Sequence, residues 1–452
     1  MLPSLSRGQV QDLRQGRTAA LFADTIPPRM TIGPLQLVRQ ATPGQRRTLV
    51  AAALGWMLDS FDAMLYALVL AHVMRDFGMS KATSGLLYTL TLLASGIGGV
   101  LFGFLADHLG RKRALMLSIV TYSVCSFASG LTTGVISLAI FRFVLGLGMG
   151  GEWNTGATLV AESWPDDLRA KAIAVVQSSW AIGYALAALV AGVVLRYANW
   201  RVVFFVGILP ALVTLWIQNR VPESDMWERR KTSSGGLGHS SGTAGDSGRQ
   251  SFFTIFSKPY RKSMFALLLL NFFGMFAWWG LFTWFPAYLS LPVSQGGRGF
   301  RVEETTLLLV AFNLFGMFPG YASFGWVADH LGRRRSFVLY TLTASVLVPL
   351  YAMTSKPAVI LVLGTILAFF GTGFFSGSGI TGSELFPTNL RARALGFTYN
   401  GARALSSAAP YVIGTVGQIK GLSWAFSLCA ISYLLASVMA TQIPETKGKS
   451  LE

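Results

Sequence analysis

Two carboxyl groups stand three residues apart inside an apolar stretch of the chain, where they could bind and release a proton. Asp59 and Asp62 belong to the string LGWMLDSFDAMLYAL, which we expect to be helical. Their spacing places both side chains on one helix face, about 4.5 Å apart along the axis. A carboxylate in mid-membrane is costly unless it is paired or protonated, and two neighbouring carboxyls do not readily ionise together. The pair predicts a proton-coupling site, with a structural ion pair to a neighbouring helix as the alternative.

A second apolar stretch, RFVLGLGMGGEWNTG, carries Arg142, Glu152 and Asn154. An arginine inside a membrane span needs an acidic partner or an anionic ligand. We therefore predict that Arg142 either contacts the substrate or pairs with an acid of the first stretch in a structural or proton-coupling role. Glu152 could pair with Arg142, take up a proton itself, or close a helix contact beside two glycines. Asn154 is a further candidate for substrate contact.

Arg403 is another charged residue within an apolar stretch. Its guanidinium fork matches the two oxygens of a carboxylate, so it could bind a substrate carboxylate. The alternative is an ion pair with one of the three acids named above. Polar and aromatic residues of the spans could add hydrogen bonds and ring surfaces to the same substrate site: Gln177, Trp180, Tyr184, Asn271, Trp278, Tyr399 and Asn400.

The composition shows which elements must position these residues. Of the 452 residues, 52% are hydrophobic and 13% are charged, whereas a soluble domain carries about 25% charged residues. A span needs about 20 apolar residues, so twelve spans would use roughly half of the chain. We therefore exclude a cytosolic enzyme and predict an all-α membrane protein with twelve spans. They lie at about 48–74, 83–107, 114–133, 136–161, 170–195, 201–221, 261–289, 305–328, 336–355, 358–384, 392–418 and 423–443.

The placement of basic residues predicts how these spans are oriented. With the N-terminus inside, 27 of the 37 Lys and Arg residues fall in inner segments and eight in outer loops, as the positive-inside rule requires. The net charge of +17 thus reflects topology rather than nucleic-acid binding. We expect a cytoplasmic N-terminal segment 1–45, a six-helix bundle 46–221, a cytoplasmic linker 222–260 with a flexible Ser- and Gly-rich core (Lys231 to Gln250), a second bundle 261–443 and a cytoplasmic tail 444–452.

Several kinds of catalytic chemistry find no support in the sequence. Two cysteines and four scattered histidines suggest neither a disulfide framework nor a metal-ligand cluster. The glycines form no Walker loop, and the GLG string at 146–148 lies inside an apolar stretch rather than at a strand–helix turn. We therefore expect no enzyme activity, no cofactor and no metal.

The two halves of the chain repeat each other at an offset of 222 residues. GFLADHLGRKR at 103–113 corresponds to GWVADHLGRRR at 325–335, ESWPDDLRAKA at 162–172 to ELFPTNLRARA at 384–394, and PES at 222–224 to PET at 444–446. A repeat containing an even number of spans predicts two bundles of the same orientation.

Acids and arginines of the repeated loops could pair across the inner ends of helices. Each exposed ion pair stabilises a protein by about 0–1 kcal/mol, which suits a contact that must break in every conformational cycle. We predict that they act in gating by holding the two bundles together on the cytoplasmic side, although Arg111 to Arg113 could serve topology alone. These residues are Asp107, Arg111, Glu162 and Arg169 in the first half and Asp329, Arg333, Glu384 and Arg391 in the second.

The pattern G-x-x-x-D-x-x-G-R at 103–111 and 325–333 resembles the loop signature of the major facilitator superfamily, and the resemblance covers nearly the whole chain beyond residue 45. It implies two pseudo-symmetric six-helix bundles. The D-x-F-D pattern at 59–62 and the string GGEW look like those of sialate, lactate and aromatic-acid proton symporters, and Arg142 resembles an arginine linked to proton coupling in the family. By contrast, NFFGMFAWWGLFT at 271–283 departs from the polar signature of fungal lactate permeases.

This resemblance implies a proton-coupled symporter that imports an organic-acid anion by alternating access. The anion would be a monocarboxylate, sialic acid or a sugar acid. We expect a monomer in a bacterial inner membrane, with both termini cytoplasmic. Alternatives are a neutral-sugar/proton symporter, a drug efflux antiporter and a non-transporting sensor on the same scaffold.

Overall fold

The computed structural model of the chain describes residues 41–224, 227–228 and 255–447. Every regular element among these residues is a helix, as the composition predicts. Most of the predicted segment 1–45, the predicted linker core from Lys231 to Gln250 and the end of the predicted tail 444–452 lie outside the described residues.

Each half of the chain contributes six helical spans. The first half contains α3 (Pro43–Phe77), α4 (Lys81–Leu109), α5 (Arg111–Gly130), α6 (Val135–Ser163), α7 (Asp166–Tyr197) and a broken span of α8 (Trp200–Val206) and α9 (Pro210–Arg220). The second half contains α11 (Lys258–Ser290), a span of α12 (Val302–Ala311), the π-helical η5 (Phe312–Met317) and α13 (Phe318–Leu331), then α14 (Arg333–Met353), α15 (Pro357–Leu385), a span of α16 (Thr388–Ser406) and α17 (Ala409–Lys420), and α18 (Leu422–Gln442).

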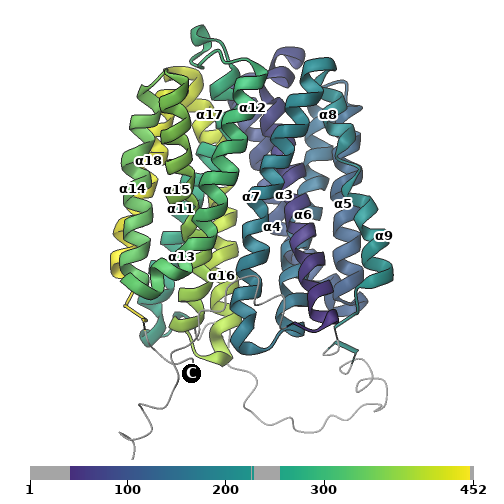
Figure 1. Cartoon of the computed structure of the whole chain (residues 1–452), viewed down its shortest axis with the longest axis vertical. Coiled ribbons are helices and arrows are strands. Elements are labelled where there is room, and N and C mark those ends of the chain that lie inside the picture. The colour runs from purple at the N-terminus through teal and green to yellow at the C-terminus, as the bar shows by residue number, and fades with distance from the viewer. Residues whose placement is uncertain (1–40, 225–226, 229–254, 448–452) are drawn as a thin grey trace, which may run out of the picture. The chain divides into compact units, whose positions relative to one another are not determined.

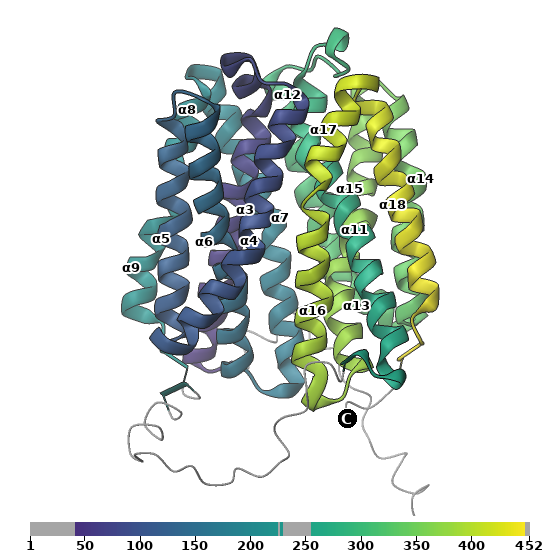
Figure 2. The ribbon, with the colours of Figure 1, turned by 180° about the vertical axis from the view of Figure 1, so that it is seen from behind.

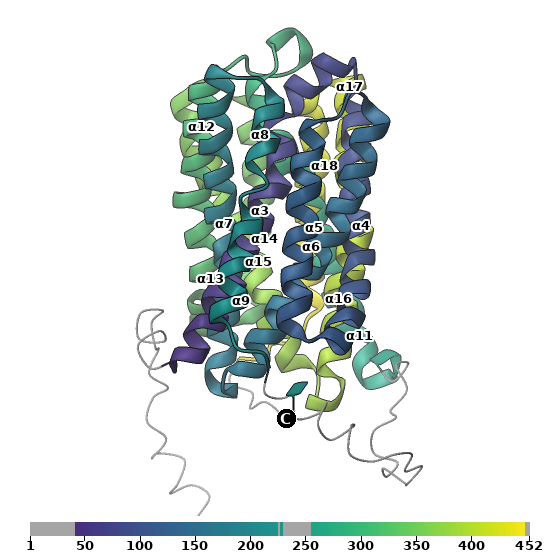
Figure 3. The ribbon, with the colours of Figure 1, turned by 90° about the vertical axis from the view of Figure 1, so that its right-hand side faces the viewer.

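The helices form two neighbouring bundles. Figure 1 shows the first half in purple to teal beside the second half in green to yellow, and Figure 2 shows the same division from behind. Seen from the side in Figure 3, the first half lies in front of the second. The helix pairs that join the bundles include α3 with α11, α4 with α17, and α7 with α12 and α13. These helices therefore enclose the space between the two halves.

The two ends of the helical unit differ in charge. The basic residues Arg111–Arg113 and Arg333–Arg335 begin α5 and α14, directly after the second span of each half. They therefore lie at the same end, which we call the basic end. Lys81 and Gln295 lie at the other end, which we call the opposite end.

Local capping explains where the two bundles begin. The Gln45 N–H donates to the Thr42 hydroxyl and the Thr42 N–H to the Gln45 side chain, at 3.3 and 2.9 Å, with Pro43 in the first turn. Helix α11 follows Ser257, whose side chain makes no capping hydrogen bond, and has a proline in its first turn. Both helices consequently start slightly before residues 46 and 261, where we expected the bundles to begin.

All twelve predicted spans are helical, and ten spans of the described chain are long and apolar enough to cross a membrane. The predicted spans 114–133 and 392–418 fall below that level. Helix α5 begins with three basic residues and is rich in serine, and the other span contains Arg391 and Arg403 and is broken between α16 and α17. The four serines of α5 and Arg403 of α16 are buried.

Candidate functional site

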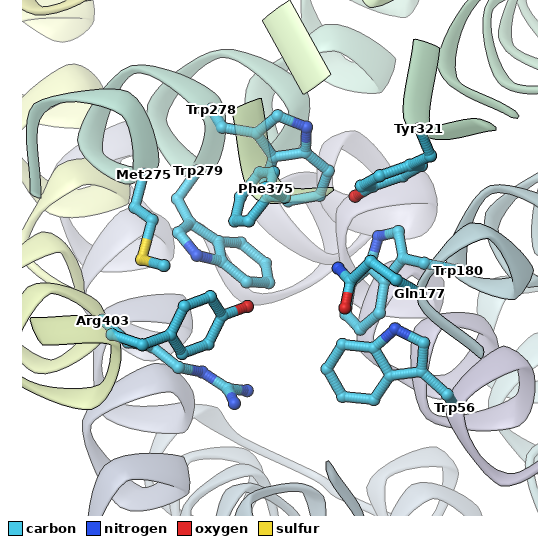
Figure 4. A pocket seen from close by; sticks show the side chains of 10 residues that line it. Trp56, Gln177, Trp180, Met275, Trp278, Trp279, Tyr321, Phe375 and Arg403 are labelled. Atoms are coloured by element: carbon cyan, nitrogen blue, oxygen red, sulfur yellow. The ribbon is translucent and has the colours of Figure 1, made fainter. Parts of the chain in front are cut away.

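A pocket lies between the two bundles. Helices α3 and α7 supply one wall, and α11, α13, α15 and α16 supply the other. Figure 4 shows Met275, Trp279 and Arg403 facing Trp56, Gln177 and Trp180 across its centre. The lining residues are Trp56, Gln177, Trp180, Met275, Trp278, Trp279, Tyr321, Phe375, Tyr399 and Arg403.

Half of the predicted substrate-contacting residues belong to this lining, namely Gln177, Trp180, Trp278, Tyr399 and Arg403. The other five predicted residues lie outside the lining. The Asn154 amide donates to the Gly99 carbonyl at 3.0 Å, the Tyr184 hydroxyl donates to the Phe282 carbonyl at 3.0 Å, and the Asn271 side chain accepts from the Ser378 hydroxyl. Asn400 is exposed, and Arg142 is buried outside the lining.

Five lining residues were not among the predicted contacts: Trp56, Met275, Trp279, Tyr321 and Phe375. Trp56 stands one helical turn before Asp59, so the spacing that paired Asp59 with Asp62 could have included it. Tyr321 and Phe375 are single rings in apolar spans, and nothing in their immediate sequence separates them from rings that face lipid.

One group of charged side chains lies beside the pocket at the junction of the bundles. Asp59 is fully buried, and Glu152 and Arg403 are 1% and 6% exposed. Arg403 interacts electrostatically with both carboxyl groups, and the two carboxyls interact with each other. Neither Asp59 oxygen has a hydrogen-bond partner among the described residues. The structure therefore unites Glu152 with Arg403 and Asp59, rather than with Arg142.

A second charged pair lies within the first bundle. The Ser126 hydroxyl donates to Asp62 Oδ1 at 2.8 Å, and Asp62 interacts electrostatically with Arg142 and with Asp59. The Arg142 guanidinium lies over the rings of Tyr66 and Phe204, 4.8 Å from each centroid. Its Nε and Nη2 have no hydrogen-bond partner among the described residues. Five buried charges thus form one cluster through the Asp59–Asp62 pair, and only Arg403 reaches the pocket.

Close helix contacts join the bundles at the opposite end. A Cβ atom on Gly85 would collide with the Pro410 carbonyl of α17, and one on Gly414 would lie 2.5 Å from the Lys81 carbonyl of α4. The Lys81 ammonium also donates to the Gln295 carbonyl at 2.8 Å, and the Tyr184 hydroxyl bond crosses between the bundles. The backbones of α4 and α17 therefore touch, and the opposite end is closed.

We expect the substitution Gly85→Leu to part α4 from α17, because the larger side chain has no space against the Pro410 carbonyl. Spin labels on Arg75→Cys and Val293→Cys, both exposed at the opposite end, should report a longer distance and transport should slow several-fold. Cys125 and Cys429 are buried and should not be labelled. The matched control is Gly103→Leu on the same helix, where a Cβ meets no atom within 4 Å. Equal distances in the two variants would contradict the close contact.

The basic end carries two copies of one ion-pair network. Arg111 pairs with Asp107 at 2.8 Å and with Glu162 at 3.2 Å. In the second half, Arg333 pairs with Asp329 at 2.8 Å and Glu384 at 2.8 Å. Each arginine also donates to the carbonyl five residues before it. All these contacts correspond at the offset of 222 residues, so the repeat extends from sequence to contacts.

These ion pairs differ from our expectation in one respect. Arg111 joins α4, α5 and α6, and Arg333 joins α13, α14 and α15, so each network ties together helices of a single bundle. With the opposite end closed, these pairs do not join the two bundles, and the expectation that they do so when the basic end closes stays a prediction. Of the other predicted gating residues, Arg169 donates to the Trp164 carbonyl at 3.4 Å, within the first bundle, and Arg391 lies near the start of α16.

Glycine and a carboxylate complete each network. Gly110 and Gly332 have φ angles of +100° and +93°, and a Cβ there would collide with the carboxylate of Glu223 or Glu445. Partial burial alone would raise the pKa of the Glu445 carboxyl, but N–H donors of Arg333, Lys447, Arg334 and Thr446 hold it below its ordinary value. In each half, a glutamate side chain accepts a backbone N–H at the start of the third span: Glu223 from Lys112 at 3.1 Å and Glu445 from Arg333 at 2.8 Å.

Among the described residues, no group of three His, Cys, Asp or Glu side chains could hold a metal ion. Twelve helical spans in two repeated bundles, with a pocket and buried charges between them, define a multi-pass membrane transporter. The chain belongs to the Major Facilitator Superfamily, whose pattern matches residues 52–323 and 289–451. The predicted family and fold are thus confirmed, and members of this family are transporters and not enzymes.

Relatives of known name support the same class. The probable 4-methylmuconolactone transporter of Cupriavidus pinatubonensis is 32% identical over 421 residues, which cover 92% of this chain and 94% of that protein. The sialic acid transporter NanX of Escherichia coli is 32% identical over 417 residues, covering 90% and 96%. The xylose transporter XylE from E. coli, solved in a partially occluded inward open conformation, matches with a TM-score of 0.71 at 18% identity over 91% of this chain and 100% of that one. The chain is therefore similar in sequence to metabolite transporters and shares the fold of the solved one.

Proposed function

We propose that the chain is a proton-coupled symporter that imports an organic-acid anion by alternating access. The observation that carries this proposal is the buried cluster of Asp59, Asp62, Glu152, Arg142 and Arg403, of which Arg403 lines the pocket. Two relatives are named as a sialic acid transporter and a probable 4-methylmuconolactone transporter, and both of these compounds carry a carboxyl group, which agrees with a cation at the pocket.

The charge balance of the cluster supports coupling to protons. Three carboxyls against two guanidiniums leave one negative charge when all five are ionised, and buried charge without a partner is costly. A substrate carboxylate at Arg403 adds another negative charge. Protons taken up by Asp59, Asp62 or Glu152 offset this charge. The protein with bound substrate can then pass through the occluded state, in which the cavity is closed to both sides of the membrane.

The same proposal assigns an orientation. The basic end faces the cytoplasm of a bacterial cell, because most Lys and Arg residues belong to that side of the inner membrane. Both termini are then cytoplasmic, and the closed opposite end is the outer side. The Arg111 and Arg333 networks keep the cytoplasmic end of each bundle rigid while the bundles separate there.

Reconstitution of the purified full-length chain in proteoliposomes tests the proposal. With the external pH below the internal pH, we expect at least one labelled compound from a panel of sialic, sugar, aromatic and short-chain acids to accumulate inside the vesicles. A protonophore should abolish this accumulation. Protein-free vesicles correct for acids that cross the bilayer in their neutral form. Accumulation that survives the protonophore, or accumulation of neutral sugars alone, would contradict organic-acid/proton symport.

A further inference from the structure

We propose that the organic acid is a flat, π-conjugated monocarboxylate, of which an aromatic carboxylate is the simplest case. This inference rests on the proposed symport and names the substrate class of the same pocket. Seven of the ten lining residues carry an aromatic ring: Trp56, Trp180, Trp278, Trp279, Tyr321, Phe375 and Tyr399.

The rings come from both bundles and present both edges and faces. Trp180 lies edge-on to Trp278 and Trp279, with ring centroids 6.1 and 6.0 Å apart, and Trp56 lies tilted 4.7 Å from Trp180. Trp278 and Phe375 meet edge-on at 5.7 Å. Aromatic rings attract one another in these offset and edge-to-face arrangements. A flat conjugated ligand can add ring–ring contacts of this kind with either bundle, whereas a saturated ring has no π system and gains only from the area that it buries.

The polar lining is too small for a polyhydroxylated acid. A sugar acid carries a hydroxyl on most of its carbons, and each hydroxyl that is buried without a partner weakens binding. Besides Arg403, the polar groups of the lining are the Gln177 amide, the hydroxyls of Tyr321 and Tyr399, and the indole N–H groups, which can only donate. Tyr321 also lies beside Gln177. This set suits a ligand with a single polar head.

The position of the positive charge defines that head. Arg403 is the single Lys or Arg among the lining residues, and its Nε and Nη2 have no hydrogen-bond partner within the described chain. The indole N–H groups of Trp56 and Trp180 are likewise buried and without a partner there. One carboxylate can accept from these donors. A second carboxylate on the same ligand would find no cation in the lining, so a monocarboxylate fits best.

The aromatic lining comes from both bundles. A ligand that contacts rings on both sides would therefore favour closure of the bundles around itself.

Three matched compounds test the class by titration calorimetry on the purified full-length chain. Benzoate has the flat ring and the charge, cyclohexanecarboxylate keeps the charge without the π system, and benzamide keeps the ring without the charge. We expect benzoate to bind about tenfold more tightly than cyclohexanecarboxylate, and benzamide not to bind. Equal binding of the two acids, or tighter binding of gluconate or sialic acid than of benzoate, would overturn the proposal.

The variant Trp180→Leu should bring the ratio of benzoate to cyclohexanecarboxylate affinity close to one, because it removes the ring at the centre of the aromatic set. Trp326→Leu, at a ring 61% exposed on α13, is the control and should keep the wild-type ratio. A ratio of affinities does not depend on how much protein is folded. An unchanged ratio in Trp180→Leu would overturn the role of the rings.

Transport separates this inference from the proposed function. Proton-driven uptake of gluconate or sialic acid that benzoate does not inhibit would overturn the aromatic class and leave symport intact. Selective binding of benzoate without any proton-driven uptake would support the ligand class and contradict proton symport.

Discussion

Proteoliposomes containing Asp59→Asn or Asp62→Asn should lose proton-driven accumulation of the organic acid. A gradient of one pH unit supports about tenfold accumulation for each coupled proton, and each variant should fall to the level of protein-free vesicles. The reason is that an amide keeps the shape of the side chain but cannot take up the proton that offsets the substrate charge. Exchange of labelled for unlabelled substrate, which needs no net proton movement, should persist in both variants.

Exchange therefore distinguishes a coupling defect from misfolding. A suitable control is Glu303→Gln, the same kind of change at an exposed carboxyl on α12, which should transport as the wild type does. Full, pH-dependent accumulation in both Asp59→Asn and Asp62→Asn would remove these residues from the coupling site and leave Glu152 as the remaining candidate.

Replacing Arg403 with Gln should weaken binding of the organic acid about thirtyfold, because a charge-assisted hydrogen bond contributes about 2 kcal/mol. Arg403→Lys keeps the charge but loses the planar fork, so its affinity should lie between those of the wild type and Arg403→Gln. Calorimetry at several substrate concentrations measures both. Arg196→Gln, an exposed position on α7, serves as the control and should bind normally.

The alternative role of Arg403 gives a different pattern. If it serves only as the counter-charge of Asp59 and Glu152, Arg403→Gln should bind the acid as tightly as the wild type while its accumulation becomes insensitive to pH. That result would place the substrate carboxylate elsewhere in the pocket, at the free indole N–H groups of Trp56 and Trp180.

The charged part of the site was predictable because charge inside a membrane span is rare and costly. Asp59, Asp62, Glu152, Arg142 and Arg403 have no charged counterpart at the offset of 222 residues, and the structure places all five in one cluster. How they pair depends on the angle at which helices cross, which no local pattern contains. The sequence left open whether Glu152 faces Arg142 or Arg403.

The aromatic part of the pocket was only half predictable, and the repeat explains why. A search for substrate residues only where the two halves differ would miss part of the lining, because Trp56 and Trp278 are equivalent positions, as are Gln177 and Tyr399. Equivalent positions from both halves line the pocket because it lies between the two bundles. The repeat was therefore a good guide to the loops and the fold, and a poor one to residues on the shared surface.

The π-helical segment η5 makes the second span of the second half one residue longer than its counterpart. The span Val302–Leu331 has 30 residues, against 29 for Lys81–Leu109. Beyond η5, Gly110 and Gly332 correspond at an offset of 222, but before it the N-caps Ser80 and Arg301 correspond at 221. One residue turns a helix by about 100°, so the two halves are out of phase on one side of η5.

When the offset of 221 is used for residues before η5, the two helix crossings at the opposite end become equivalent positions of the repeat. At an offset of 221, Gly85 becomes the counterpart of Thr306, while Gly192 and Gly414 correspond at 222. Gly85 and Gly414 belong to the crossing of α4 with α17, and Thr306 packs against Gly192 in the crossing of α7 with α12. The opposite end is thus closed by two helix crossings that are equivalent in the repeat. In the crossing of α4 with α17, backbone contacts backbone directly. In the crossing of α7 with α12, the Thr306 side chain lies between the two backbones. Opening of the opposite end must separate the helices of both crossings.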